Sequence, residues 1–165
     1  MLLRGIRKSK WYKSPAVPWL PQDELQADAL GDLSTSSNIL SVWLINEDKS
    51  NLEEVVAALA SNRNDLTNFD YAVVSLKDVL NAGINVKDVG GETADNHANE
   101  HWHRNLEELT VSHLVSLART IQGSGQIKRV TQKKVALWIR RNIESGQLDS
   151  TRIEQRILSK ARSVN

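Results

Sequence analysis

The pattern of apolar and polar positions predicts two buried strands joined by a helix in the first half of the chain. Residues 39–45 are almost wholly apolar and too few for a helix, so they predict a strand. Ser50 and Glu53 match a capping box, and the apolar side chains of residues 51–62 then recur on one helical stripe. Residues 69–75 predict a second buried strand. Because a single helix connects these strands, we expect a βαβ unit whose strands run parallel.

Beyond the second strand the pattern predicts mainly helix. A short helix is expected after Ser75, and Gly83 occupies the position at which many helices end. Residues 84–95 show no period and are expected to be irregular. Residues 96–121 keep a helical period almost without a break, which predicts the longest helix of the chain.

Two further helices are predicted near the carboxyl terminus. Thr131 is expected to cap the first of them, which would bury Trp138 and Ile139 on its inner side. Asp149 or Ser150 is expected to cap the second.

These elements predict an α/β or α+β fold that is rich in helix. We expect a single domain over residues 1–165, with a small, partly parallel sheet and its βαβ unit in residues 39–95. Residues 96–165 are expected to form a three-helix part with a basic end.

Residues 1–22 predict a basic, extended arm rather than part of the core. Prolines recur at every third residue, which would align them along one edge of a polyproline II helix, and aromatic residues lie between them: Pro15, Pro18 and Pro21 with Trp11, Tyr12 and Trp19. The arm is either a proline-rich ligand for another protein or a strap on its own domain. We favour the strap, because amphipathic aromatic side chains are most easily buried nearby.

The amino-acid composition limits the chemistry that the protein can perform and the cellular compartments that suit it. The chain has no cysteine, which excludes disulfides, thiolate nucleophiles and cysteine-ligated zinc and fits a reducing compartment. The first residues lack the apolar core of a secretory signal, and no window approaches the ~18 apolar residues of a membrane span. We therefore expect a cytoplasmic protein without a membrane partner.

Charge is sorted along the chain, although the net charge is only +1. The first 21 residues hold 5 bases and no acid, residues 22–125 hold 17 acids against 6 bases, and residues 126–165 hold 10 bases against 3 acids. Sorted charge steers association with partners of opposite sign.

The basic end is expected to display its cations as a surface. Helical spacing places four cations of the helix after Thr131 opposite Trp138, and two arginines follow in the next helix. The predicted partner-binding residues are Lys133, Lys134, Leu137, Arg140, Arg141, Arg152 and Arg156. We expect a non-catalytic binding or regulatory module that recognises an acidic protein surface or self-associates. Nucleic-acid binding is the alternative, because rows of Lys and Arg neutralise phosphates.

The four histidines of the chain lie between residues 97 and 113. His97, Glu100 and His101 fit the inverted zinc motif H-x-x-E-H, so a zinc-dependent hydrolase is a second alternative. The motif needs a third ligand from elsewhere, and in a continuous helix His103 and His113 would face other directions. We therefore predict no stoichiometric metal, no cofactor and no catalytic residue, and we expect His113 to be buried with a hydrogen bond.

Overall fold

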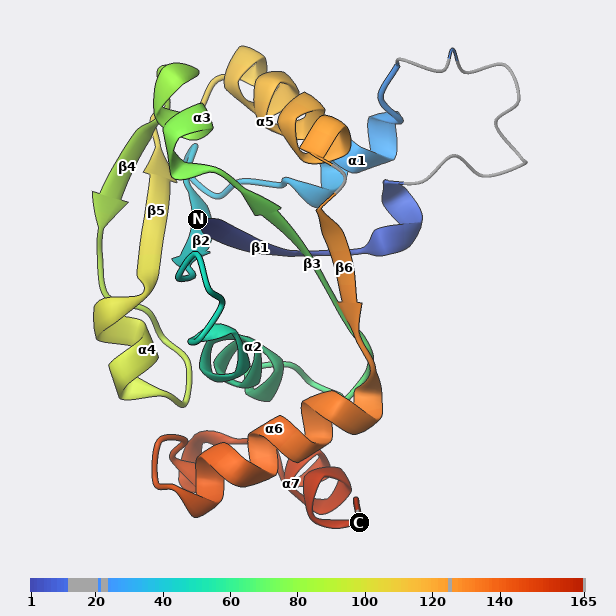
Figure 1. The fold of residues 1–165 in the computed structure, drawn as a ribbon, viewed down its shortest axis with the longest axis vertical. Helices are drawn as coiled ribbons and strands as arrows, with labels where there is room; N and C mark the ends of the chain where they lie inside the picture. Colours follow the sequence, from blue (N-terminus) through green and yellow to red (C-terminus); the bar gives the residue numbers. More distant parts are fainter. Residues whose placement is uncertain (12–20, 22–23, 125, 165) are drawn as a thin grey trace. The chain divides into compact units, whose positions relative to one another are not determined.

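A computed structural model describes residues 1–11, 21, 24–124 and 126–164 of the chain (Figure 1). Six strands form one sheet in the order β4-β5-β2-β1-β3-β6. All the strands of the described residues are antiparallel to their neighbours. The strands are β1 (Leu2–Ile6), β2 (Leu40–Leu44), β3 (Phe69–Val74), β4 (Asn85–Asp88), β5 (His103–Glu107) and β6 (Ile127–Val130).

Seven α-helices and two short 3-10 helices complete the described residues. The α-helices are α1 (Ala27–Asp32), α2 (Leu52–Ser61), α3 (Leu76–Asn81), α4 (Asn96–His101), α5 (Val111–Ser124), α6 (Gln132–Glu144) and α7 (Gln155–Arg162), and the 3-10 helices are η1 (Lys8–Lys10) and η2 (Ser150–Arg152). Among the described residues, no helix combines the length and the apolar character that a membrane crossing requires.

The chain forms two compact units, each assembled from three separated segments. The first comprises Met1–Val42, Asp70–Lys87 and Asn105–Lys128, and the second comprises Trp43–Phe69, Asp88–Arg104 and Arg129–Asn165. The expected division into residues 39–95 and 96–165 therefore differs from the units that the fold makes.

In the first unit, β1 pairs with β3 along its whole length, from Leu2 opposite Val74 to Ile6 opposite Asp70. Leu2 and Leu3 are fully buried. The helix α1 contacts α5 and η1. Asp32 of α1 accepts hydrogen bonds from the indole of Trp11 (2.8 Å) and from the backbone N–H of Arg7 (2.6 Å), which fixes the chain after β1.

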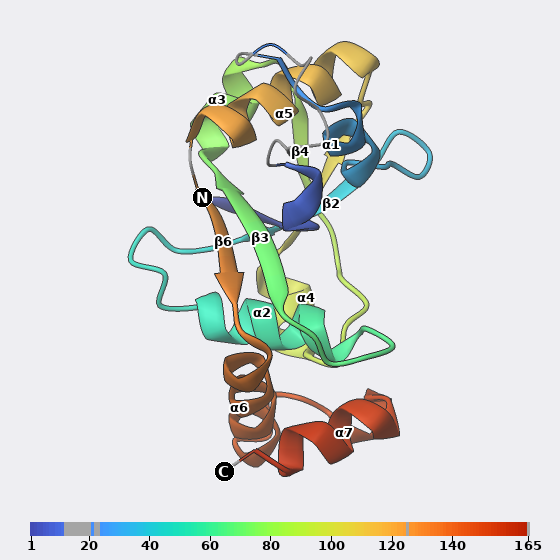
Figure 2. The same cartoon turned by 90° about the vertical axis from the view of Figure 1, so that its right-hand side faces the viewer.

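In the second unit, α6 packs against α2 and α7, and α4 contacts α2. Figure 2 shows α6 and α7 beside each other at the carboxyl-terminal end. The core of this unit contains Val55 and Val56 of α2, Ile139 of α6 and Ile157 of α7, all of which are fully buried. Burial of these aliphatic side chains is the main stabilising contribution to the packing.

The predicted partly parallel sheet with a βαβ unit is wrong. The strands predicted at residues 39–45 and 69–75 and the helix between them are confirmed as β2, β3 and α2. However, β1 lies between β2 and β3 in the sheet and is antiparallel to both, so β2 and β3 share a direction without pairing. The parallel prediction assumed that the two strands were neighbours, and the strand that separates them comes from the predicted arm.

The predicted long helix over residues 96–121 is also wrong. This segment contains α4, β5 and the greater part of α5. Trp102 ends α4, and β5 then buries His103 and Leu106 between β4 and β2. Pairing with two neighbouring strands satisfies the backbone of β5, and this overrides a helical period.

Three strands have no clear signal in the sequence. The edge strand β4 is largely exposed, and the edge strand β6 buries only its two end residues, so both show little apolar pattern. Strand β1 lies within the predicted arm of residues 1–22. The arm's Tyr12, Pro15, Pro18 and Trp19 lie outside the described residues.

The sequence signals for helix ends were confirmed at Gly83 and Thr131 and were wrong at Ser50. Gly83 follows α3 with a φ of +73°, and the Thr131 side chain caps α6 by accepting from the Lys134 N–H, both as predicted. The capping box at Ser50 and Glu53 is wrong, because the N-cap of α2 is Asn51. The side chain of Asn51 bonds to the backbone N–H of Asn46 and the carbonyl of Leu44 instead.

Candidate functional site

The helix α6 places its cations on the side that its packing leaves uncovered. Its inner face buries Val135, Ala136, Trp138, Ile139 and Asn142. Of the residues that the sequence predicted for partner binding, Lys133, Lys134 and Arg141 are exposed, whereas Arg140 and Leu137 are half-buried. Leu137 is thus partly covered rather than displayed among the cations.

Both arginines of α6 already have partners in the same unit. Arg141 forms an ion pair with Glu53 of α2, with 3.8 Å between Nη1 and Oε2. Arg140 lies 3.6 Å from Glu144 and donates to the backbone carbonyl of Val164 at 2.5 Å. Only a third of the Arg140 side chain is exposed. These guanidinium groups are therefore engaged within the chain.

Two cations of the last helix, Arg156 and Lys160, share one aspartate. Asp65, which precedes β3, accepts from Lys160 at 2.6 Å and lies 3.4 Å from Arg156. The hydrogen bond from Lys160 lowers the pKa of Asp65, and the charge of Arg156 acts in the same direction. Arg152 donates to the side-chain oxygen of Asn96 at 2.8 Å.

Charges that are sorted in the sequence are balanced within the second unit. Its three segments contain 12 Lys and Arg residues and 12 Asp and Glu residues. Two of the acids that meet the basic helices, Glu53 and Asp65, come from the acidic middle of the chain. The unit as a whole therefore has a formal net charge of zero with neutral histidines.

Three cations of the basic helices remain without an acidic partner among the described residues. Lys133 and Arg162 are exposed, and their side chains have no hydrogen bond or ion pair within that part of the chain. The ammonium group of Lys134 lies 4.9 Å from the centre of the Trp138 ring, a cation–π contact that leaves its charge uncompensated.

An open cleft of about 470 Å³ lies beside Lys133. Its lining combines apolar, hydroxyl, amide and ammonium groups from α6, from the end of the chain and from the loop before β3: Leu66, Gln132, Lys133, Ala136, Lys160, Ser163 and Val164. A cleft lined by apolar residues and two lysines can hold a chain segment that carries both an apolar side chain and a carboxylate.

The four histidines occupy different environments. His97 and His101 are exposed on α4, and their rings stack with 4.4 Å between centres and 21° between planes. His103 is buried on β5 beside Trp43, where burial lowers its pKa and the Val89 carbonyl lies 3.2 Å from its Nδ1. His113 is half-buried and accepts from the Thr110 N–H.

The histidines of the H-x-x-E-H motif do not direct their nitrogen atoms at one point. The nitrogen lone pairs of an imidazole lie in the plane of the ring, and nearly parallel planes 4.4 Å apart do not direct both at one ion. His97 instead lies against Glu54 of α2, with 2.5 Å between Nδ1 and Oε1. The hydrogen bond with Glu54 raises the pKa of His97.

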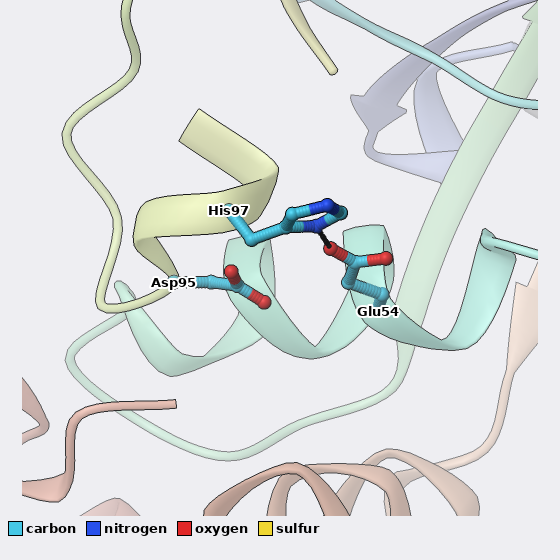
Figure 3. A group of neighbouring side chains, drawn as sticks. All are labelled: Glu54, Asp95 and His97. Carbon is cyan, nitrogen blue, oxygen red and sulfur yellow. Dashed lines mark hydrogen bonds and ion pairs between the residues drawn. The ribbon is translucent and has the colours of Figure 1, made fainter. Parts of the chain in front are cut away.

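Asp95 joins His97 and Glu54 in a cluster that the sequence did not indicate (Figure 3). Each of the three residues offers one ligand atom, and these atoms lie within 4.8 Å of one another. Asp95 is fully buried, and burial raises its pKa. Glu54 and His97 are 43 positions apart in the sequence, so no local pattern could have predicted that they meet.

Comparison of the chain with models of protein families, with curated proteins and with solved structures finds no match. The function is therefore argued from the arrangement of side chains.

Proposed function

We propose that this chain is a non-catalytic binding module that recognises an acidic segment of another protein at the cleft beside α6. The observation that carries the proposal is a cleft whose lining combines apolar residues (Leu66, Ala136 and Val164) with two lysines, Lys133 and Lys160. Lys133 has no partner among the described residues, so its charge is available to a ligand.

The contacts of the arginines reduce the number of predicted partner-binding residues that are free to contact a ligand. Arg140, Arg141 and Arg156 are paired with acids of the same chain, and Arg152 is bound to Asn96. Of the predicted binding residues, Lys133 lines the cleft, and we propose it as the main contact of the ligand. The arginines serve the packing of the helices. A ligand carboxylate at Lys160 would compete with Asp65, which holds that ammonium group at 2.6 Å.

A protein ligand fits this site better than a nucleic acid does. Duplex DNA carries one charge per ~1.7 Å of axis, and its affinity grows with the number of phosphates that free cations neutralise. The second unit has equal numbers of acids and bases, and most of its helical arginines are already engaged. A short acidic protein segment needs fewer free cations than duplex DNA does, and it can also contact the apolar residues of the cleft. A cytoplasmic location stays a prediction from composition.

A labelled peptide tests the proposal. A short fluorescein-labelled peptide of Glu and Leu is titrated with the purified full chain, and fluorescence anisotropy reports binding. Reversal of one central charge, Lys133→Glu, is expected to weaken binding about tenfold or more, which corresponds to ~1.4 kcal/mol. Lys134→Glu is expected to have a smaller effect, because the Lys134 ammonium lies over Trp138.

The matched control is Lys77→Glu, which reverses an exposed lysine of α3 in the other unit. It should leave the affinity unchanged. Absence of binding by the Glu and Leu peptide, or equal affinity of the Lys133→Glu variant and the wild type, would show that the proposal is wrong. Tighter binding of a labelled DNA duplex, falling steeply with salt, would favour the nucleic-acid alternative instead.

A further inference from the structure

We propose that Glu54, Asp95 and His97 bind a divalent first-row transition-metal cation. This site lies in the second unit and does not depend on the proposed peptide-binding cleft. The three side chains come from α2, from the N-cap of α4 and from the first turn of α4, and they point toward one another (Figure 3). From the sequence we considered His97, Glu100 and His101 as a zinc motif and predicted that no metal binds. The present proposal replaces that prediction with a site made of other residues.

The buried carboxylate of Asp95 is the observation that points to a cation. Asp95 has no exposed surface, and its Oδ1 accepts from the Ala98 N–H at 2.8 Å. Its Oδ2 is buried without a hydrogen-bond partner among the described residues. A buried polar atom that lacks a partner is costly, and a metal ion is one of the partners that satisfies a buried carboxylate.

The donor atoms are close enough to converge on one ion after small movements. Ligand bonds of about 2.0–2.1 Å at tetrahedral angles place the donor atoms about 3.3 Å apart. The contact of His97 with Glu54 at 2.5 Å would lengthen on binding, and any longer separation, which is at most 4.8 Å, would shorten. Rotation of side chains achieves both without movement of the helices.

The site is anchored on its inner side and open on its outer side. The Glu54 side chain is 13% exposed, whereas the His97 side chain is 51% exposed. The backbone of Asp95 is held as well, because its carbonyl accepts from the Asn99 N–H at 3.0 Å. The exposed edge of His97 provides a path for an ion from solvent. Three protein donors also leave a coordination position for water.

The donor set selects the class of metal. Two carboxylates and a neutral imidazole carry a charge of −2, which a divalent cation neutralises. Ca²⁺ and Mg²⁺ prefer oxygen donors, whereas an imidazole among the ligands favours zinc or a neighbouring transition metal. Zn²⁺ is therefore the probe of choice, and Co²⁺ serves as its coloured substitute.

Zinc titration of the full chain tests the site. Untagged protein is first freed of metal with a chelator and then titrated with Zn²⁺ in competition with a chromogenic indicator. The wild type is expected to bind one Zn²⁺ per chain. Asp95→Asn and Glu54→Gln are each expected to weaken binding by at least about tenfold, since loss of an outer-shell partner alone costs that much. Visible bands of bound Co²⁺ should weaken in the same variants.

Neighbouring residues of the same types provide matched controls. Glu53→Gln replaces the residue beside Glu54, and Glu100→Gln and His101→Asn remove the other members of the H-x-x-E-H motif. All three are expected to bind Zn²⁺ within about twofold of the wild type, which is far less than the loss expected for a ligand. Far-UV circular dichroism confirms that each variant is folded. Asn caps helices about as well as Asp does, so Asp95→Asn preserves the start of α4.

Three outcomes would overturn the proposal. The first is the absence of saturable Zn²⁺ binding at millimolar concentrations. The second is unchanged affinity in Glu54→Gln, which remains informative if Asp95→Asn fails to fold. The third is loss of binding in His101→Asn and Glu100→Gln with retention in Glu54→Gln, which would assign the metal to the H-x-x-E-H motif.

Discussion

The side chain of Asn99 occupies the space beside Gly91 and closes the loop that leads into Asp95. Its Oδ1 accepts from the backbone N–H and the hydroxyl of Thr93, at 2.9 and 2.7 Å, and its Nδ2 donates to the Thr93 carbonyl. The backbone N–H of Gly91 donates to the Asn99 carbonyl at 3.0 Å. A buried amide thus holds the segment before α4 in one conformation, and this positions Asp95.

Substitution of Gly91 tests this packing. In Gly91→Ala, the new methyl group would lie 2.8 Å from Asn99 Oδ1 and 3.1 Å from Cη2 of Trp43. Because neither neighbour is free to move, we expect the free energy of unfolding to fall by about 1–3 kcal/mol, as in other overpacked sites. Urea denaturation followed by circular dichroism measures the change.

Gly90→Ala is the matched control, since a Cβ at Gly90 meets no atom within 4 Å. It should change stability by much less than Gly91→Ala does. Equal stability of the two variants would contradict this account of the loop.

At the scale of elements, one aspartate anchors the last helix. Asp65 accepts from Lys160 and lies beside Arg156, which are one turn apart on α7. Neutralisation in Asp65→Asn is expected to lower the Tm by a few degrees at most, because the group is partly exposed and solvent screens the charges. Thermal unfolding at neutral pH measures this change.

The ion pair of Asp65 with Lys160 predicts how the stability of the protein changes with pH. The hydrogen bond with Lys160 lowers the pKa of Asp65 in the folded state. Its contribution to stability is therefore complete above the unfolded-state pKa of about 3.9 and is lost as the pH falls through the lower folded-state pKa. Asp65→Asn should consequently lose less stability than the wild type when the pH is lowered below about 4.

Glu47→Gln provides the control for this measurement, because Glu47 is exposed and its side chain has no partner among the described residues. Its acid unfolding should follow the wild type. Identical loss of stability in Asp65→Asn and the wild type at low pH would show that Asp65 does not anchor α7.

The helices α2 and α6 were predictable from the local pattern, although their burial differs. The helix α6 buries one face, whereas no residue of α2 is exposed. The predicted range 51–62 agrees with α2 within one residue at each end, and α6 begins after Thr131 as predicted. The segment of α4, β5 and α5 was not predictable in this way, because Leu106 and Leu117 fit a helical stripe although they belong to a strand and a later helix. The strand that contains Leu106 is decided by its pairing with β4 and β2.

At the scale of the whole molecule, β1 is an interior strand rather than an arm. It lies between β2 and β3 in the sheet, and Leu3, which is opposite Val73, is fully buried. Leu3→Ala is therefore expected to lower the free energy of unfolding by about 2–5 kcal/mol, the cost of a core leucine. Chemical denaturation with a two-state fit measures this loss.

Ser9→Ala, a substitution of an exposed residue a few positions later, is the control and should be nearly neutral. A loss of stability as small for Leu3→Ala as for Ser9→Ala would restore the view of the first residues as an arm.

The distribution of charge also belongs to this scale. The acidic middle and the basic end of the sequence predicted a surface of one sign, yet folding brings Glu53 to Arg141 and Asp65 to Lys160. Of the predicted binding residues, Lys133 and Lys134 have no acidic partner among the described residues, and Lys133 lines the cleft that we propose as the binding site. The segregation of charge along a sequence is therefore a weak guide to the electrostatic field around the folded protein.

The amino-acid order alone set the features that depend on near neighbours. These include the strands β2 and β3, the helix α2, the buried face of α6, the cap at Thr131 and the absence of cysteine chemistry. Strand order, strand direction, the partners of the arginines and the meeting of Glu54 with Asp95 and His97 depended on the tertiary structure. The physical reason is that these contacts join residues far apart in the chain, and topology rather than local periodicity selects such pairs.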